Sequence, residues 1–368
     1  MMNKKEHLTE YSRVIRVETV RTCPIIVGAN LVNKLGEHFD FSGYSSIVLI
    51  TDTGVNKLYG PSVIAALEAT GRRLSALVLP VGERAKSLRM AEHGYRFLLE
   101  HNTDRKGLIC TLGGGVVGDL GGYLAATYLR GVDYLQLPTT LLAQIDSSIG
   151  GKVGINFGGK KNMVGSFYQP RAIIADVSFL NSLTPAEMRN GLAEAIKYGL
   201  AMDAALFQMI EQKATGFNTD ELIDIVRRCS ALKASIVEAD EMERSGQRAI
   251  LNFGHTVGHA VEAVTGLHVR SHGEAVAIGM VAAARISERA GMLDSNSRQR
   301  VEGVLRKHEL PTACREASPN DLLKAIHFDK KTTSGQTAWV LLQGIGNGVV
   351  NQHVPDNMVK DVLKEICR

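Results

Sequence analysis

The run Leu108-Ile109-Cys110-Thr111-Leu112-Gly113-Gly114-Gly115-Val116-Val117-Gly118-Asp119 joins an apolar stretch to a glycine-rich turn. The apolar part is typical of a buried β-strand, and a helical pattern continues beyond the turn. Gly113, Gly115 and Gly118 match the GxGxxG pattern, whose glycines let the backbone approach a pyrophosphate at a helix N-terminus. A single match is weak evidence, because a tight turn also needs glycine. The run predicts a strand–turn–helix unit and makes a dinucleotide site a hypothesis.

The alternation of strand and helix extends through the first half of the chain. The other predicted strands are Ile47–Thr51, Leu74–Leu79, Tyr134–Leu137 and Ala172–Ala175. From about Thr184 the pattern changes to long helical stretches, which are Ala186–Met202, Asp220–Asp240, Thr256–Thr265 and Gly273–Ala290. We therefore predict a parallel-sheet α/β domain at residues 1–180 and a helical domain at residues 181–368, with a ligand crevice between them.

Composition places the chain among ordinary globular proteins. Its 368 residues are 45% hydrophobic and 22% charged, and the formal charge of +4 comes from scattered basic residues, which does not favour a nucleic-acid partner. No apolar stretch reaches the about 20 residues of a bilayer span, and Met1–His7 lacks the apolar region of a signal peptide. We expect a cytoplasmic protein with no membrane partner. Reduced thiols are expected at the five widely spaced cysteines, Cys23, Cys110, Cys229, Cys314 and Cys367.

Polar residues follow the predicted strands. Asp52 ends the first of them, and Glu83 and Lys86 follow the second, so they lie at carboxyl ends of parallel strands, where ligands bind. Each of these residues can also be a simple helix cap. A later run, residues 138–162, is dense in hydroxyls, glycine and lysine. Its lysines can hold phosphate as point charges, and Asp146 can accept hydrogen bonds from substrate hydroxyls.

Glu194, His255 and His272 form a candidate metal site. One carboxylate and two neutral imidazoles leave a zinc-like ion an open position, which is typical of a catalytic metal. Glu194 and Lys197 lie three apart on one helical face, although a solvated ion pair has the same spacing. His255 and His259 lie four apart, so both can point into one site. A histidine taken alone is more often a structural hydrogen-bonding residue, and the prediction depends on the joint occurrence.

These segments closely resemble the 3-dehydroquinate synthase family of sugar phosphate cyclases, from the strand before Asp52 to Asp329-Lys330-Lys331. The resemblance implies a Rossmann-like, parallel-sheet NAD domain followed by an all-α metal and substrate domain, and a homodimer. It implies a carbon–oxygen lyase of the shikimate pathway that converts the sugar phosphate 3-deoxy-D-arabino-heptulosonate 7-phosphate to 3-dehydroquinate and phosphate. The implied steps are transient oxidation with bound NAD, β-elimination of phosphate, reduction and an intramolecular aldol closure.

The resemblance also implies roles for particular residues. Family metal ligands, normally for zinc and sometimes for cobalt, match Glu194, His255 and His272. Positions that hold NAD match Asp52, Glu83, Lys86, Gly115, Val116, Asp119, Thr139, Thr140, Lys152 and Lys161. Catalytic and substrate positions match Asp146, Lys152, Asn162, Lys197, Lys233, Arg248, Asn252, His259 and Lys330, with Lys331 as the alternative to Lys330. Arg130 resembles an arginine that reaches a neighbouring subunit's phosphate pocket. This chain has one residue more than the family pattern between Lys233 and Arg248. The match of Lys233 therefore requires that the extra residue lie in the loop around residues 242–247.

Three other functions are compatible with parts of this sequence. A sister cyclase would act on sedoheptulose 7-phosphate or on an aminated or glucose phosphate, but such enzymes usually change the positions of Arg248, Asn252 or His259. A metal-dependent polyol dehydrogenase would need no phosphate pocket, so Lys152 and Lys161 count against it. A binding protein with an inactive site is disfavoured because no reactive position is lost.

Overall fold

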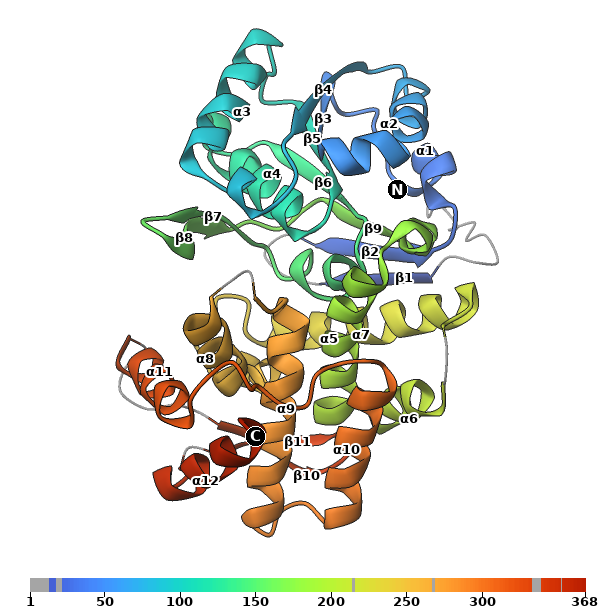
Figure 1. Cartoon of the computed structure of the whole chain (residues 1–368). Helices are drawn as coiled ribbons and strands as arrows, with labels where there is room; N and C mark the ends of the chain where they lie inside the picture. The colour runs from blue at the N-terminus through green and yellow to red at the C-terminus, as the bar shows by residue number, and fades with distance from the viewer. Residues whose placement is uncertain (1–12, 18–21, 214–215, 267–268, 333–338, 352) are drawn as a thin grey trace. The chain divides into compact units, whose positions relative to one another are not determined.

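The chain is described from a computed structural model, which gives residues 13–17, 22–213, 216–266, 269–332, 339–351 and 353–368 (Figure 1). Contacts divide the chain into two compact units, and each is described by itself. The first unit is Met1–Leu183 with Asn218–Met242, and the second is Thr184–Phe217 with Glu243–Arg368. Helix α7 (Thr219–Ala239) therefore belongs to the same compact unit as the N-terminal part of the chain. The assignment of separate functions to residues 1–180 and 181–368 stays a prediction.

A seven-stranded sheet forms the centre of the first unit, in the order β1-β2-β9-β6-β5-β3-β4. The edge strand β1 runs antiparallel to β2, and every other neighbouring pair is parallel. The strands are β1 (Arg13–Val17), β2 (Cys23–Gly28), β3 (Ser46–Asp52), β4 (Arg73–Leu79), β5 (Gly107–Gly113), β6 (Asp133–Pro138) and β9 (Ala172–Asp176). This confirms the predicted α/β class with a parallel sheet.

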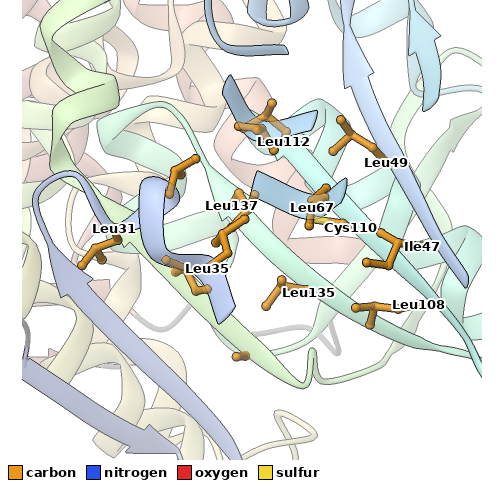
Figure 2. Packing of buried hydrophobic residues seen from close by; sticks show 14 of the residues in the cluster. Leu31, Leu35, Ile47, Leu49, Leu67, Leu108, Cys110, Leu112, Leu135 and Leu137 are labelled. Atoms are coloured by element: carbon orange, nitrogen blue, oxygen red, sulfur yellow. The ribbon is translucent and has the colours of Figure 1, made fainter. Parts of the chain in front are cut away.

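The central strands β3, β5 and β9 are almost wholly buried, so both faces of the sheet are covered there. On β3, Ile47 and Leu49 join one core cluster while Val48 and Ile50 join the other, as the two-residue period of a strand requires. Figure 2 shows the first cluster, which includes Leu67 of α2 (Thr53–Glu68). Helices α3 (Leu88–Glu100) and α4 (Gly115–Thr127) contribute side chains to the second cluster. The helices of these layers are η1 (Leu31–Lys34), α1 (Leu35–His38), α2 (Thr53–Glu68), η2 (Glu83–Ala85), α3 (Leu88–Glu100) and α4 (Gly115–Thr127).

The strand order reverses at β3, which pairs with β4 on one side and with β5 on the other. Ligands of open α/β sheets bind outside the carboxyl ends of the strands at such a reversal. Asp52 ends β3 there, and the glycine-rich turn follows β5. The structure gives Asp52 a capping role, since its Oδ1 accepts hydrogen bonds from the backbone of Gly54 at 2.8 Å and Val55 at 2.9 Å.

The polar run of residues 138–162 folds into two elements of the first unit. Residues Ala143–Ser147 form the π-helical turn η4, and β7 (Lys152–Phe157) pairs antiparallel with β8 (Lys160–Phe167) as a separate hairpin. Every residue of β8 is exposed. The short helices η3 (Tyr128–Arg130) and η5 (Val177–Ser182) complete the unit.

The second unit is helical, as predicted, apart from a small antiparallel sheet of β10 (Trp339–Gly344) and β11 (Asn347–Asn351). The expectation of an all-α half is corrected in this respect. Its helices are α5 (Pro185–Met202), α6 (Ala204–Gln212), η6 (Gln247–Asn252), α8 (His255–Thr265), α9 (His272–Arg289), α10 (Ser295–Lys307), α11 (Pro319–Thr332) and α12 (Asp356–Ile366). Among the described residues, no helix has the length and apolarity to cross a bilayer. None of the five cysteines, all of which lie among the described residues, forms a disulfide.

Candidate functional site

The predicted metal ligands come together in the second unit from three helices. Glu194 lies inside α5, while His255 and His272 are the first residues of α8 and α9. Nε2 of His255 lies 3.7 Å and Nε2 of His272 lies 3.5 Å from Oε1 of Glu194. One donor atom from each residue falls within 4.8 Å of the other two, so the three can hold a single metal ion.

Groups behind the two imidazoles fix which nitrogen faces the cluster. Nδ1 of His255 lies 3.2 Å from the Phe253 carbonyl, and Nδ1 of His272 lies 3.4 Å from Oε1 of Glu262. A carbonyl or carboxylate behind a ring holds a proton on Nδ1 and leaves Nε2 as the ligand atom. Both histidines therefore present Nε2 to Glu194.

Burial and charge suit the cluster to a divalent cation. Glu194 is fully buried, and its carboxylate pairs with the equally buried ammonium of Lys197, so this is not a solvated ion pair. Neither carboxylate oxygen has a hydrogen-bond partner of good geometry in the described part of the chain. Burial alone would raise the pKa of Glu194, but Lys197 and the imidazoles hold that pKa well below its ordinary value. A buried carboxylate kept ionised beside two imidazoles fits a zinc-like ion.

The two imidazoles differ in their protonation. Burial, reinforced by the Lys197 charge, lowers the pKa of His255 to about 3, so this ring is neutral at pH 7. Burial opposes charge on His272 as well, but the carboxylates of Glu194 and Glu262 beside its two ring nitrogens raise the pKa of His272 to about 10. A divalent ion at this position would therefore compete with one proton.

A close contact between α5 and α9 brings His272 to Glu194. The backbone N–H of Gly273 donates a hydrogen bond to Oδ1 of Asn190 at 2.6 Å. A Cβ atom on Gly273 would lie 2.4 Å from the Asn190 carbonyl oxygen, so only glycine permits this approach. Ser271 and Glu274 form a capping box that starts α9 at His272.

The other predicted residues of the second unit lie on α8, η6 and α11. The ring of His259 lies edge-on to His255, with centroids 5.3 Å apart, as their spacing along α8 predicted. Arg248 on η6 is 5% exposed. Its Nε and Nη2 atoms have no hydrogen-bond acceptor within the described residues, and Nη1 lies 3.8 Å from Glu243. Asn252 ends η6. Lys330 and Lys331 belong to α11, but their side chains lie outside the described part of the structure.

In the first unit the predicted residues form pairs across long stretches of sequence. Lys86 is buried and its ammonium contacts both Asp119 on α4 and Asn162 on β8. Nζ of Lys233 on α7 lies 2.6 Å from Oδ1 of Asp146 and 2.7 Å from the Asp146 carbonyl oxygen. The assignment of both residues to the substrate site stays a prediction.

The remaining predicted residues lie on loops and element ends of the same unit. Gly115 and Val116 begin α4, Thr139 and Thr140 follow β6, and Lys152 begins β7, while Lys161 lies on β8. Arg130 ends η3 within a turn in which Leu129, Arg130 and Gly131 have φ values of 52°, 69° and 124°. Two consecutive non-glycine residues in the left-handed region indicate a strained turn, which is a frequent feature of functional sites.

Two residues beside the metal cluster were missed by the sequence analysis. Glu262 follows His255 by seven positions and His259 by three, so the spacing on one face of α8 was a usable signal. Asn190 precedes Glu194 by one helical turn, but nothing in the sequence links it to Gly273, which lies 83 residues away.

One unit contains a parallel sheet of the dinucleotide-binding type, and the other contains a buried carboxylate and two imidazoles that can hold a metal ion. Together these features are typical of an enzyme that uses a nucleotide cofactor and a metal ion. The family models described as 3-dehydroquinate synthase N-terminal and C-terminal match residues 76–190 and 191–332. The chain belongs to the 3-dehydroquinate synthase family. It is 40% identical over 350 residues to the 3-dehydroquinate synthase of Desulforamulus reducens, covering 94% of this chain and 97% of that protein. It is 42% identical over 351 residues to that of Opitutus terrae, covering 94% and 96%.

A solved structure gives a further comparison. The 2-epi-5-epi-valiolone synthase of Streptomyces hygroscopicus subsp. jinggangensis, solved with NAD+ and Zn2+ bound, superposes with a TM-score of 0.85 at 26% identity. The match covers 96% of this chain and 99% of that chain. That protein shares the fold, but its named activity differs from that of the two sequence relatives.

Proposed function

We propose that this chain is a 3-dehydroquinate synthase, which converts 3-deoxy-D-arabino-heptulosonate 7-phosphate to 3-dehydroquinate and inorganic phosphate. The membership of the family and the 40% and 42% identity to two such enzymes support this function. The reaction is a carbon–oxygen lyase reaction with no net oxidation, because the hydride removed from the substrate is returned later in the same turnover. The cofactors are NAD and a divalent metal, zinc or cobalt.

The feature that carries the choice of substrate is Arg248. A buried guanidinium whose Nε and Nη2 atoms find no acceptor among the described residues is costly unless a ligand supplies acceptors. A carboxylate matches the guanidinium fork with two parallel hydrogen bonds. The proposed substrate carries a carboxylate, whereas sedoheptulose 7-phosphate carries none, so Arg248 favours the synthase over the sister cyclase.

In the second unit, Glu194, His255 and His272 would hold the metal through one carboxylate oxygen and two Nε2 atoms. The metal, when bound, supplies Lewis-acid chemistry that makes a coordinated hydroxyl easier to deprotonate. Lys197 neutralises the Glu194 carboxylate in a buried setting. The imidazole of His259, edge-on to His255, is placed to accept and return a proton at a ring nitrogen.

In the first unit, the carboxyl ends of β3 and β5 would bind NAD. The ion pair of Lys86 with Asp119 would hold these two side chains in place within the site. NAD supplies a reversible hydride acceptor when it is bound. Lys233 holds the Asp146 carboxylate in place, so that Asp146 can accept hydrogen bonds from substrate hydroxyls. Charge on the departing phosphate would be balanced by Lys152, Asn162, Lys197 and Arg130. Arg130 would act from the partner copy of a homodimer.

A comparison of two substrates tests the proposal. The metal-loaded protein with NAD is assayed for phosphate release from 3-deoxy-D-arabino-heptulosonate 7-phosphate and from sedoheptulose 7-phosphate. The proposal predicts that kcat/KM for the carboxylate substrate is higher by at least about 100-fold, because a site built for a hydrogen-bonding group rejects a substrate that lacks it. A preference for sedoheptulose 7-phosphate would assign the chain to the sister cyclases instead.

A further inference from the structure

Asn156, at the end of β7, joins two segments of the first unit that carry predicted binding residues. Its Nδ2 donates a hydrogen bond to Oε1 of Glu83 at 2.7 Å, and its Oδ1 accepts one from the backbone N–H of Asn162 at 2.9 Å. Its own backbone N–H donates to the Lys86 carbonyl at 2.9 Å, and it forms an isolated parallel bridge with Ser87. One side chain thus connects the loop after β4 to the β7–β8 hairpin.

The amide is the only group of this size that satisfies both partners. It donates from Nδ2 to a carboxylate and accepts at Oδ1 from an N–H. An aspartate at this position would still accept from Asn162 but would place a second carboxylate opposite Glu83. An alanine would leave both partners without their hydrogen bond. Position 156 therefore suits a neutral side chain that both donates a hydrogen bond to Glu83 and accepts one from Asn162.

A second contact runs in parallel with the first. The ammonium of Lys86 reaches Oδ1 of Asn162 and the carboxylate of Asp119. Asn162 has a φ of 56°, so its backbone adopts the left-handed conformation in which its N–H meets Asn156. The hairpin residue Asn162 is therefore held by its backbone through Asn156 and by its side chain through Lys86.

We infer that Asn156 is a positioning residue, which couples the nucleotide-binding loop at Glu83 and Lys86 to the hairpin that carries Lys161 and Asn162. The inference rests on the proposed function, in which Glu83, Lys86 and Lys161 bind NAD and Asn162 contacts the sugar phosphate. A shift of the Glu83 loop would reach the backbone of Asn162 through the Asn156 side chain, in parallel with the contact between Lys86 and the Asn162 side chain. Asn156 itself touches neither ligand in this scheme.

A double-mutant cycle on Asn156 and Glu83 tests the coupling. Asn156→Asp places two carboxylates face to face, and the added change Glu83→Gln restores a hydrogen bond with donor and acceptor reversed. NAD affinity is measured by titration calorimetry on the metal-loaded protein. We expect Asn156→Asp to weaken NAD binding about 10-fold in the parent protein and by no more than about 2-fold in the Glu83→Gln background. Equal effects of Asn156→Asp in the two backgrounds would overturn the inference.

Kinetics provide a second readout. Asn156→Asp should raise KM for the sugar phosphate, and the double variant should recover the KM of Glu83→Gln alone. An unchanged KM in Asn156→Asp would also contradict the coupling. Ser166→Ala on β8, whose hydroxyl contacts the neighbouring Phe167 carbonyl at 3.5 Å, is the matched control and should leave both measurements unchanged. If the parent protein shows no synthase activity, the double-mutant cycle on NAD affinity still tests the role of Asn156 independently of the proposed function.

Should Asn156→Asp fail to fold, the Glu83→Gln/Asn156→Asp double variant remains a test. A folded double variant beside an unfolded single one supports the pairing of the two side chains, and two unfolded variants contradict it. Circular dichroism and the melting temperature distinguish these outcomes.

Discussion

Oε1 of Glu262 lies 3.4 Å from Nδ1 of His272, behind the ring whose Nε2 faces Glu194. A carboxylate in this position holds the imidazole in one tautomer and one orientation, and its loss typically weakens metal binding about 10- to 100-fold. Glu262→Gln should therefore lower zinc affinity by that factor, because an amide holds the ring less firmly. Competition with a chromophoric chelator measures the affinity without any assay of activity.

The control for this change is Glu309→Gln, in the same unit. Glu309 forms an exposed ion pair with Arg189 at 2.7 Å and lies outside the metal cluster. Its substitution should leave zinc affinity unaltered. An affinity of Glu262→Gln equal to that of the parent protein would remove Glu262 from the metal site.

Gly273 should not tolerate a side chain. In Gly273→Ala the new Cβ would meet the Asn190 backbone at 2.4 Å, so α9 must move away from α5 and carry His272 from Glu194. We expect a loss of about 1–3 kcal/mol in the free energy of unfolding, together with weaker zinc binding. Urea denaturation and chelator competition measure the two effects.

Gly303 provides the comparison for Gly273. It lies within α10, and a Cβ there would meet nothing within 4 Å. Because alanine is the better helix former, Gly303→Ala should raise stability by up to about 1 kcal/mol. Similar losses of stability in both variants would show that the α5–α9 approach is not the cause.

The parts of this site that were predictable from the sequence are those formed by residues close together in the chain. The four-residue spacing of His255 and His259, for example, predicts that both lie on one face of a helix. The β5 turn was predictable because strand, glycines and helix follow one another directly. The seven-residue spacing of Glu262 from His255 is a local signal of the same kind.

The unpredicted features depend on contacts between distant parts of the chain. Nothing in the local sequence of α7 shows that it groups with the N-terminal unit. The β7–β8 hairpin is exposed along all of β8, so it lacks the apolar alternation by which strands are found. The contact of Lys86 with Asn162 joins positions 76 residues apart.

Arg248→Ala should impair turnover selectively. If the guanidinium holds the substrate carboxylate, its loss should cost about 2–5 kcal/mol in transition-state binding, which is roughly 30-fold or more in kcat/KM. Turnover of a carboxylate-free heptulose phosphate should change far less. Steady-state kinetics with both substrates measure the difference, and equal losses would argue against a carboxylate clamp.

Glu302 on α10 should make the protein sensitive to acid. Its side chain is 5% exposed and accepts hydrogen bonds from Arg285 at 2.9 Å and Arg306 at 3.2 Å. Burial opposes its charge, but the Arg285 hydrogen bond and the surrounding guanidinium groups lower the pKa of Glu302 below its ordinary 4.5. The folded state therefore takes up this proton less readily than the unfolded state. Its contribution to stability is present above pH 4.5 and is lost as pH falls through the folded pKa.

Glu302→Gln should accordingly lower the free energy of unfolding by about 1–3 kcal/mol at pH 7, with a smaller difference from the parent protein at acid pH. Chemical denaturation across a pH series measures this. Glu92→Gln, which breaks an ion pair whose side chains are 64% and 70% exposed, should cost less than about 1 kcal/mol. A difference between Glu302→Gln and the parent protein that stayed constant as the solution was acidified would contradict the assignment.

Product analysis tests the central claim most directly. The protein is loaded with zinc and NAD and given 3-deoxy-D-arabino-heptulosonate 7-phosphate, phosphate is quantified, and dehydroquinate is detected in the ultraviolet after coupling to a dehydratase. The synthase assignment predicts equal amounts of phosphate and dehydroquinate, no accumulation of reduced nicotinamide, and loss of both products on chelation. Reduced nicotinamide accumulating without phosphate release would instead identify a dehydrogenase and contradict the account.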